Sequence, residues 1–220
     1  MKLVIKFPTR NRPSQFLKTL DRYLRFLDDK NTTIIVTCDN DDLSMKEDHI
    51  TEYLKQYQNV KVFFGDNNGK IDAINANLEG VDFDIILLAS DDMLPVVKGF
   101  DTIIKNKMTE HYQDTDGVLW FNDGHTANKL NTLSILGKKY YDRFGYIYNP
   151  EYKSVYCDNE FTDVANILKR QTYFDEVIIE HQHPDWGYGN RDEIHSMNLA
   201  NVGYDSSIYN KRRLINFGLW

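Results

Sequence analysis

The chain has 220 residues, 41% of them hydrophobic and 27% charged, a composition that is ordinary for a globular domain and excludes a disordered, collagenous or coiled-coil protein. Its two cysteines cannot form the disulfide framework of a small secreted protein, and no apolar run has the roughly 18–20 residues of a membrane span. The formal net charge of −7 excludes a generally basic coat for nucleic acid. We expect a single cytoplasmic domain over residues 1–220, without a transmembrane segment.

The first half of the chain alternates predicted strands and helices. Short β-branched or apolar runs predict the strands, and apolar residues at helical spacing predict the helices. In chain order they are strand 3–7, helix 13–27, strand 33–38, helix 44–56, strand 60–64, helix 70–78, strand 84–89 and helix 96–108. The continuous apolar run within 84–89 is typical of a central parallel strand that is covered on both faces.

The second half is less regular. It predicts strands at 117–121, 133–136 and 177–180, helices at 138–144, 163–170 and 192–200, and an irregular segment at 151–156. The tail from residue 201 shows no clear periodicity. Because no repeat or low-complexity linker interrupts the sequence, we treat it as one domain.

Polar residues cluster directly after the predicted strands of the first half. The strand–helix order predicts an α/β domain with a mostly parallel sheet, and ligands of such sheets bind beyond the carboxyl ends of the strands. The segments at those ends are 8–10, 39–42, 66–69 and 90–92. The topology alone therefore predicts a binding pocket lined by these segments.

Adjacent carboxylates at the end of the central strand suggest a metal site. Asp91 and Asp92 would repel each other, and a hard divalent cation that also binds substrate phosphates would relieve that repulsion. The alternative is that Ser90 or Asp92 caps a following helix.

Cationic and acidic residues at the other strand ends fit a nucleotide. Lys70 follows Asn68-Gly69 at the start of a helix, where anions bind well, and Arg10 and Arg12 could grip a diphosphate. Asp39 could accept a hydrogen bond from a nucleobase imide or a ribose hydroxyl. The alternative for Lys70 is a plain Asn-Gly turn with a solvated lysine. The alternative for the arginines is that they lie on the surface, and for Asp39 that residues 39–42 form a solvated acidic turn.

Four short motifs in order resemble glycosyltransferase family 2, which has the GT-A fold. They are Phe7-Pro8-Thr9-Arg10-Asn11-Arg12, the segment 36–42, Asn68-Gly69-Lys70 with Ala73 and Asn75, and Leu88-Ala89-Ser90-Asp91-Asp92. The resemblance implies a Rossmann-like, mostly parallel central sheet flanked by helices, with a smaller mixed region on the acceptor side. It also implies a nucleotide-sugar-binding half (1–110), an acceptor and catalytic half (111–200) and a C-terminal tail (201–220) that could serve as a lid.

The same resemblance assigns roles to residues of the first half. Pro8, Thr9 and Asp39 would frame the nucleobase, and Lys70 and Asn75 would lie near the ribose or diphosphate. We group Arg10 with these nucleotide-sugar-binding residues. Ser90-Asp91-Asp92 would be the "DxD" element, with Asp91 facing the ribose or sugar and Asp92 binding the metal. The family often has an aspartate where this chain has Ala89.

The segment 157–161 resembles the acidic catalytic motif of the family. Cys157 replaces the usual glutamate, so Asp158 is the first choice for the general base and Glu160 the second. An inverting transfer needs a carboxylate that takes the proton of the attacking acceptor hydroxyl. The alternative is that both acids serve a helix N-terminus.

Two histidines are candidates for the metal. His181 and His183 alternate at the end of a predicted strand, so both could face one site. The resemblance implies a C-terminal histidine in the metal shell, and we choose His183 to accompany Asp92. The predicted cofactor is Mn²⁺ or Mg²⁺, and imidazole suits manganese better. The alternative is a pair of surface histidines.

Aromatic and amide groups at 120–123 suit an acceptor sugar, so Trp120, Asn122 and Asp123 are predicted on the acceptor side. A buried core tryptophan is the alternative. A lid over the diphosphate would be formed by Trp186, Tyr188, Arg191, Tyr209, Arg212 and Arg213. The alternative is a C-terminus that is simply packed or disordered.

The resemblance implies metal-dependent transfer of a sugar from a nucleoside diphosphate sugar, with UDP expected, to a hydroxyl of a glycan or lipid-linked acceptor. Inversion is expected if Asp158 is the base. One alternative is a virus-type enzyme that glycosylates a hydroxylated DNA base, using a basic face of Lys129, Lys138, Lys139, Arg143 and Lys153. Another alternative is an inactive nucleotide-sugar-binding module, which is favoured by Ala89 and Cys157, because the family usually has acidic residues at these two positions. The Gly-rich loops of nucleotidyltransferases and dinucleotide-binding oxidoreductases are absent.

Overall fold

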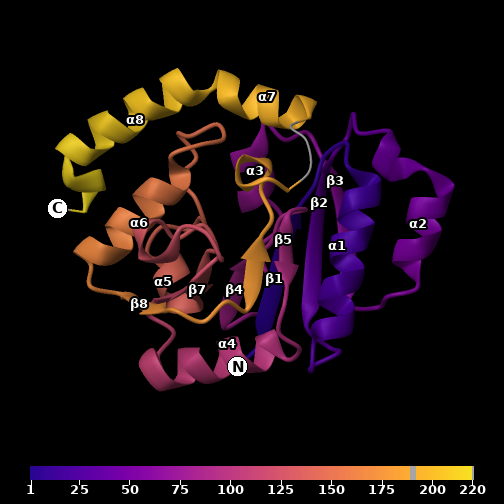
Figure 1. The fold of residues 1–220 in the computed structure, drawn as a ribbon, viewed down its shortest axis with the longest axis horizontal. Helices are drawn as coiled ribbons and strands as arrows, with labels where there is room; N and C mark the ends of the chain where they lie inside the picture. Colours follow the sequence, from indigo (N-terminus) through magenta and orange to yellow (C-terminus); the bar gives the residue numbers. More distant parts are fainter. Residues whose placement is uncertain (189–191, 220) are drawn as a thin grey trace.

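A computed structural model describes residues 1–188 and 192–219 (Figure 1). The elements of the first half are β1 (Leu3–Pro8), α1 (Pro13–Phe26), β2 (Thr33–Asp39), η1 (Ser44–Lys46), α2 (Asp48–Lys55), β3 (Val60–Gly65), α3 (Lys70–Asn75), β4 (Ile85–Leu88), β5 (Met93–Pro95) and α4 (Phe100–His111). Those of the second half are β6 (Val118–Phe121), η2 (Ala127–Lys129), β7 (Ile135–Gly137), α5 (Lys138–Asp142), α6 (Cys157–Ile167), β8 (Gln171–Phe174), β9 (Ile179–His181), η3 (Pro184–Trp186), α7 (Glu193–Ala200), α8 (Val202–Leu214) and η4 (Asn216–Gly218).

One sheet of seven strands forms the centre, in the order β3-β2-β1-β4-β7-β6-β8. The strands β3, β2, β1 and β4 run parallel, as do β6 and β8 with each other, and β7 pairs antiparallel with both β4 and β6. β5 and β9 form a separate antiparallel pair, which brings residue 93 opposite residue 181. The predicted α/β class with a mostly parallel sheet is confirmed.

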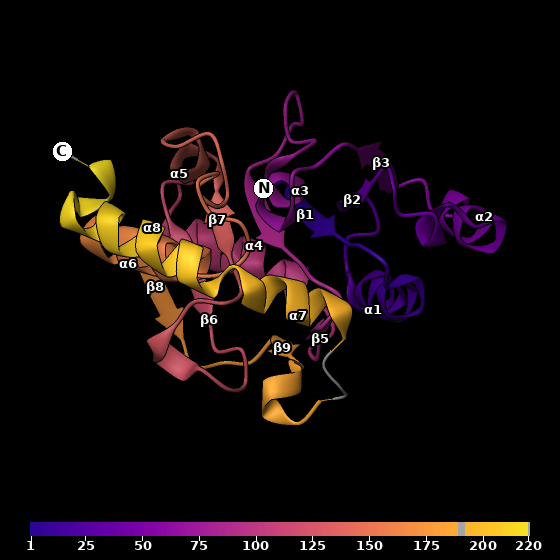
Figure 2. The same ribbon diagram turned by 90° about the horizontal axis from the view of Figure 1, so that it is seen from above.

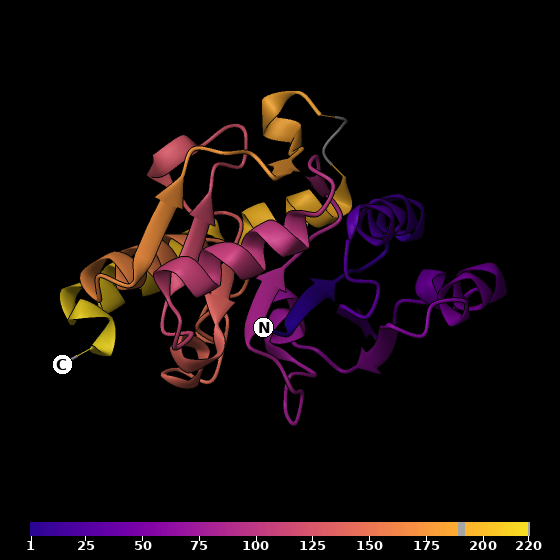
Figure 3. The same cartoon turned by 90° about the horizontal axis from the view of Figure 1, so that it is seen from below.

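Alternation along β1 distributes its side chains to two cores. Ile5 and Phe7 face the layer of α1, α2 and α4, where the Phe7 ring packs edge-on against Phe16, with ring centroids 5.0 Å apart. Val4 faces the layer of α3, α5 and α6. Figure 3 shows α4 lying across the strands on its side of the sheet. All four residues of β4 are buried, as expected for a central strand covered on both faces.

The tail differs most from the sequence-based expectation. Residues 202–214 form α8, although the sequence shows no apolar stripe there, because this helix is fastened by polar contacts instead. Its Asp205 is fully buried, and its Arg212 makes ion pairs with Glu151 and Glu160. α7 and α8 follow one another across the top of the molecule (Figure 1, Figure 2).

Other boundaries also shift. α6 begins at Cys157 rather than at residue 163, so it includes the acidic motif. The predicted helix 44–56 is divided into η1 and α2, and α3 ends at Asn75 because Ala76 is extended. The short strands β5 and β8 were not predicted. No helix within the described residues is long and apolar enough to cross a membrane.

Candidate active site

A cleft of about 1130 Å³ opens where the parallel strands end. Its walls come from the segments after β1, β2, β3 and β4, from the start of α6 and from α7. The predicted site residues that line it are Pro8, Thr9, Arg10, Asp39, Lys70, Ser90, Asp91, Asp92, Asp158 and His183. The sheet therefore brings together residues from both halves of the chain.

At one end of the cleft, two aspartates share an arginine. The Arg10 guanidinium donates to Asp39 and, at 2.9 and 2.8 Å, to the two carboxylate oxygens of Asp41. Asn67 donates its amide N–H to Asp39 Oδ1 at 2.7 Å. These contacts raise the pKa of Arg10 and lower that of Asp41. Arg10 thus holds the buried Asp39, and both residues line the cleft. A contact of Arg10 with a diphosphate stays a prediction.

Asp91 is turned into the protein. Thr9 donates its hydroxyl to the carboxylate oxygens of Asp91 at 3.1 and 3.2 Å, and Thr19 donates to the Asp91 carbonyl at 2.6 Å. Burial raises the pKa of Asp91 to about 8, against the opposing charge of Arg12. Thr9 and Asp91, which were predicted separately to contact the nucleobase and the ribose or sugar, therefore form one hydrogen-bonded unit in the lining of the cleft.

Asp92 lies beside His181, whereas the sequence-based choice was His183. Asp92 Oδ2 is 3.5 Å from His181 Nε2, because the β5–β9 pairing places the two residues next to each other. Burial opposes the ionisation of Asp92, but His181, the Ser90 hydroxyl and Lys70 outweigh it and hold the pKa of this carboxyl below its usual range. His183 also lines the cleft, and its Nδ1 accepts the Asp185 N–H at 3.2 Å.

The pair Asp92 and His181 fits a divalent cation that binds together with a phosphorylated ligand. Among the described residues, no group of three or more His, Cys, Asp or Glu side chains forms a complete cage. The Asp92 carboxylate and the His181 imidazole both line the cleft, and the buried His181 Nδ1 has no hydrogen-bond partner among the described residues. Mg²⁺ and Mn²⁺ sites commonly take their remaining ligands from water and substrate phosphates, so this donor set fits either ion.

Asp158 reaches the cleft from the first turn of α6. Burial raises its pKa, with Lys70 and His181 opposing. The α6 N-cap is Tyr156, and no side chain caps it. Asp158 instead accepts the neighbouring Asn159 N–H at 3.0 Å. Asp158 thus accepts an N–H of the first helical turn, as the alternative of an acid at the helix N-terminus predicts, and its carboxylate with a raised pKa also lines the cleft.

Glu160 and Asn75 lie outside the cleft. Glu160 is buried on the far side of α6, where Arg212 and Tyr152 donate to it. Asn75 accepts the Ile147 and Tyr148 N–H groups and donates to the Tyr148 carbonyl, so it fastens a loop. Neither the role of Glu160 as second base nor that of Asn75 near the ribose agrees with these positions.

The three predicted acceptor-side residues also lie outside the cleft walls. Trp120 is buried in β6, which agrees with the core alternative. Asn122 accepts the Gly124 N–H and donates to Asp175, and Asp123 accepts two loop N–H groups and two threonine hydroxyls. The Asn122 and Asp123 side chains therefore stabilise the loop after β6 through these hydrogen bonds.

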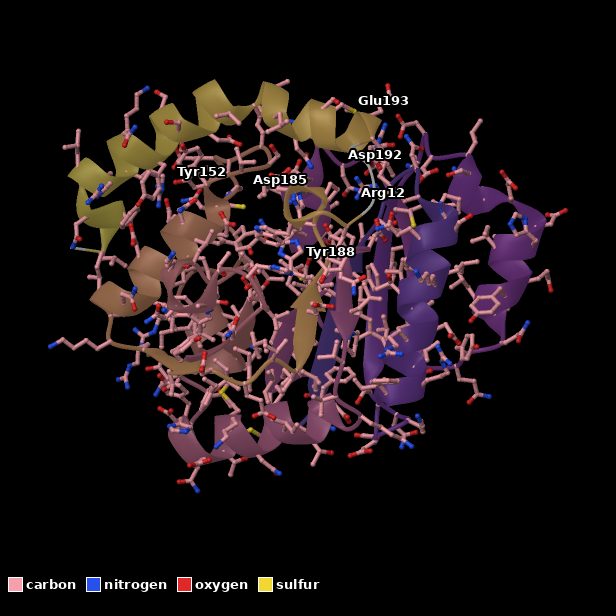
Figure 4. All side chains as sticks on the ribbon, in the orientation of Figure 1. Arg12, Tyr152, Asp185, Tyr188, Asp192 and Glu193 are labelled. Carbon is pink, nitrogen blue, oxygen red and sulfur yellow. The ribbon has the colours of Figure 1, made fainter. Side chains whose placement is uncertain are left out.

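The tail residues have mixed positions. Arg12 donates twice to Asp192 at 2.7 Å, which fastens the start of α7 beside α1 (Figure 4).

Trp186 stacks on His125 with centroids 4.4 Å apart, outside the cleft lining. Arg191 of the predicted lid lies outside the described residues. Sequence reasoning missed the α7 side chains that line the cleft, Met197, Asn198 and Leu199, because the α7 sequence carries no motif.

The model of glycosyl transferase family 2 matches residues 5–147. The chain belongs to this family. The match includes all four motifs of the first half and ends before the acidic segment at Asp158. A search of curated proteins finds no match.

Solved structures of glycosyltransferases share the fold of this family 2 domain. TarS of S. aureus (residues 1–349, in complex with UDP-GlcNAc) aligns with a TM-score of 0.66 and 19% identity, over 89% of this chain and 61% of that one. The mannosyltransferase PcManGT from Pyrobaculum calidifontis, in complex with GDP-Man and Mn²⁺, aligns with a TM-score of 0.65 and 13% identity. The alignment covers 93% of this chain and 69% of the mannosyltransferase chain. A longer TarS chain aligns with a TM-score of 0.63 and 19% identity, and this chain spans 36% of the length of that chain. The predicted GT-A fold is confirmed.

Proposed function

We propose that this chain transfers a sugar from a UDP-sugar to a hydroxyl acceptor, with inversion at the anomeric carbon and with a divalent metal ion. The observation that carries this proposal is the meeting of Asp39, Lys70, Asp92 and Asp158 in one cleft at the ends of the parallel strands. The cleft exceeds the roughly 300–1,000 Å³ of common small-molecule sites, so it has room for a donor together with part of an acceptor.

The structural neighbours support the donor class. TarS structures hold UDP-GlcNAc or UDP, and the mannosyltransferase structure holds GDP-Man with Mn²⁺. In this chain Asp39 is the buried acidic group at the β2 end that lines the cleft, where it can accept a hydrogen bond from an imide N–H of a base. Uracil and guanine both carry such a group, and two of the three neighbouring complexes hold uridine nucleotides.

At the diphosphate, Asp92 and His181 would hold the metal ion, and Lys70 adds a positive charge. Such an ion neutralises the negative charge that develops on the leaving nucleoside diphosphate. Lys70 is near enough to affect the pKa of both Asp92 and Asp158. It therefore lies between the leaving group and the base in this assignment.

Asp158 would be the base. As the acceptor hydroxyl attacks the anomeric carbon, its proton passes to the Asp158 carboxylate, the new glycosidic bond forms and the old C–O bond breaks with its electron pair leaving on the diphosphate. A raised pKa makes this carboxylate a stronger base than an exposed aspartate. The acceptor is proposed to be a glycan or lipid-linked sugar.

Donor binding and turnover test the proposal together. We expect calorimetric titration to show tighter binding of UDP-sugars with Mn²⁺ than without it, and mass spectrometry to show sugar transfer to oligosaccharide acceptors or hydrolysis to UDP. In Asp92→Asn the metal-dependent part of the binding should be lost. Binding without transfer or hydrolysis would favour the inactive binding module, and no binding of any nucleotide sugar would refute the donor site.

A further inference from the structure

Helix α8 contacts the chain immediately before Asp158. Asp205, in the first turn of α8, is fully buried. Its carboxylate accepts the backbone N–H groups of Lys153, Ser154 and Val155, each at 2.9 Å. Ser154 and Val155 line the cleft. One side chain of the tail thus fixes three consecutive peptide groups of a segment that has no helix or strand of its own.

The other end of α8 contacts the chain immediately after Asp158. Arg212 donates to both carboxylate oxygens of Glu160, at 2.7 and 3.0 Å, and to Glu151 at 2.7 Å. Glu160 also accepts the Tyr152 hydroxyl at 2.8 Å, and Tyr152 lies below α8 in Figure 4. A bidentate arginine–carboxylate pair fixes orientation as well as distance, so the first turn of α6 is held from outside the cleft.

Between these two anchors the backbone adopts a costly conformation. Tyr156 has φ +59°, in the left-handed region that bulky residues avoid. Such conformations persist only where the surroundings hold them. The Tyr156 ring lies against Tyr209 of α8, with centroids 5.5 Å apart. The turn that directs Asp158 into the cleft is therefore supported by α8 at three places.

We propose that α8 is the positioning element of the catalytic base, and that Asp205 and Arg212 are its positioning residues. This proposal rests on the proposed function only in taking Asp158 as the base. Residues 202–214 then hold the turn before Asp158 in place, and loosening them would leave the donor site formed but the base misplaced.

Asp205→Asn is the informative change because it keeps the size of the side chain. An amide carries N–H donors where the carboxylate accepts, so it cannot satisfy the N–H groups of three consecutive residues. Asp163→Asn is the matched control. Within the described residues, Asp163 accepts only the Tyr209 hydroxyl, at the same α6–α8 interface. An asparagine Oδ1 can still accept this single bond, so the contact of Tyr209 with Tyr156 is kept in the control.

Two readouts should change together in Asp205→Asn. Trypsin should cut after the exposed Lys153 at least about tenfold faster in the folded protein, since local opening controls such cleavage. The kcat should fall about 10- to 100-fold, as expected for a misplaced catalytic group, while the Kd for the UDP-sugar and its KM stay close to those of the unchanged chain. Asp163→Asn should change neither readout.

Unchanged cleavage and kcat in folded Asp205→Asn would overturn the proposal, as would a lower kcat without faster cleavage. If that variant does not fold, Arg212→Lys keeps the charge but loses the bidentate geometry, and the same two readouts decide. Absence of any transfer by the unchanged chain would refute the proposed function, whereas the cleavage comparison would still show whether α8 orders this segment.

Discussion

Asp158 combines exposure to the cleft with a raised pKa. Burial disfavours its charged form, and Lys70 from α3 and His181 from β9 only partly compensate, while Tyr148 and Cys157 also lie near it. As a base it must be ionised, so activity should be lost as the pH falls through its pKa. We expect the acidic limb of kcat/KM against pH to lie above about 3.9, the ordinary aspartate pKa.

The matching substitution is Asp158→Asn. It should lower kcat by about 10²- to 10⁴-fold, the usual contribution of general base catalysis, while calorimetry shows the UDP-sugar still binding. A variant that keeps its turnover would remove Asp158 from the mechanism.

The two histidines of the cleft should differ in their effect on metal binding. His181 is 3.5 Å from Asp92, whereas His183 is bonded to the backbone at Asp185. Mutation of residues behind the metal ligands commonly costs about 10- to 100-fold in affinity. We therefore expect His181→Ala, which removes a ligand, to weaken Mn²⁺ binding in the presence of UDP by at least about 10-fold, and His183→Ala to weaken it much less. Titration calorimetry on EDTA-treated protein measures both. A larger loss of Mn²⁺ affinity in His183→Ala than in His181→Ala would show that His183, the residue chosen from the sequence, is the metal ligand.

At the scale of elements, β1 contains a charged residue inside the sheet. Lys6 is fully buried and donates to the Thr37 hydroxyl, which in turn donates to Asn77 at 2.8 Å. Burial lowers the pKa of Lys6 to about 7, with Cys38 opposing weakly. The unfolded chain keeps this proton up to about pH 10.4. Unfolding therefore takes up a proton between these values, and stability should rise from pH 7 toward pH 10.

Lys6→Met removes the group that must give up its charge. We expect the free energy of unfolding at pH 7 to rise by about 1–4 kcal/mol, the range found when buried ionic groups are replaced by apolar ones. The increase should shrink as the pH approaches 10. Urea denaturation between pH 6 and 9 measures both effects, with the exposed Lys18→Met as control. An identical pH slope in the Lys6 variant would show that Lys6 does not titrate in this window.

At the scale of the whole molecule, three of the five residues of the predicted basic face (Lys129, Lys138, Lys139, Arg143 and Lys153) form ion pairs with aspartates. Lys138 pairs with Asp142, Lys139 pairs with Asp114 at 2.7 Å, and Arg143 pairs with Asp116. With a net charge of −7, little positive potential remains for a DNA backbone. We expect duplex DNA to bind no more tightly than about 10⁻⁴ M at physiological salt. Fluorescence anisotropy at rising salt measures this, and tight binding that falls steeply with salt would favour a DNA acceptor.

Local sequence patterns were sufficient to predict the strand–helix order of the first half, apart from the short β5, and the cleft at its strand ends. Periodicity and β-branched runs are short-range signals, and parallel strands end at one edge of a sheet. The sequence alone therefore groups Asp39, Lys70 and Asp92 at one site, and the family resemblance adds Asp158 and the chemistry. The tertiary structure agrees with these predictions from short-range patterns.

The remaining features depend on contacts between segments that are far apart in the chain. His181 replaces His183 beside Asp92 because β5 pairs with β9. Glu160 leaves the cleft because the helical turn after Asp158 points it toward Arg212. The helix α8 forms where no apolar stripe predicts one, because buried charge pairs and backbone contacts fasten it. Such contacts depend on which residues meet in space, and the local sequence pattern does not contain that information.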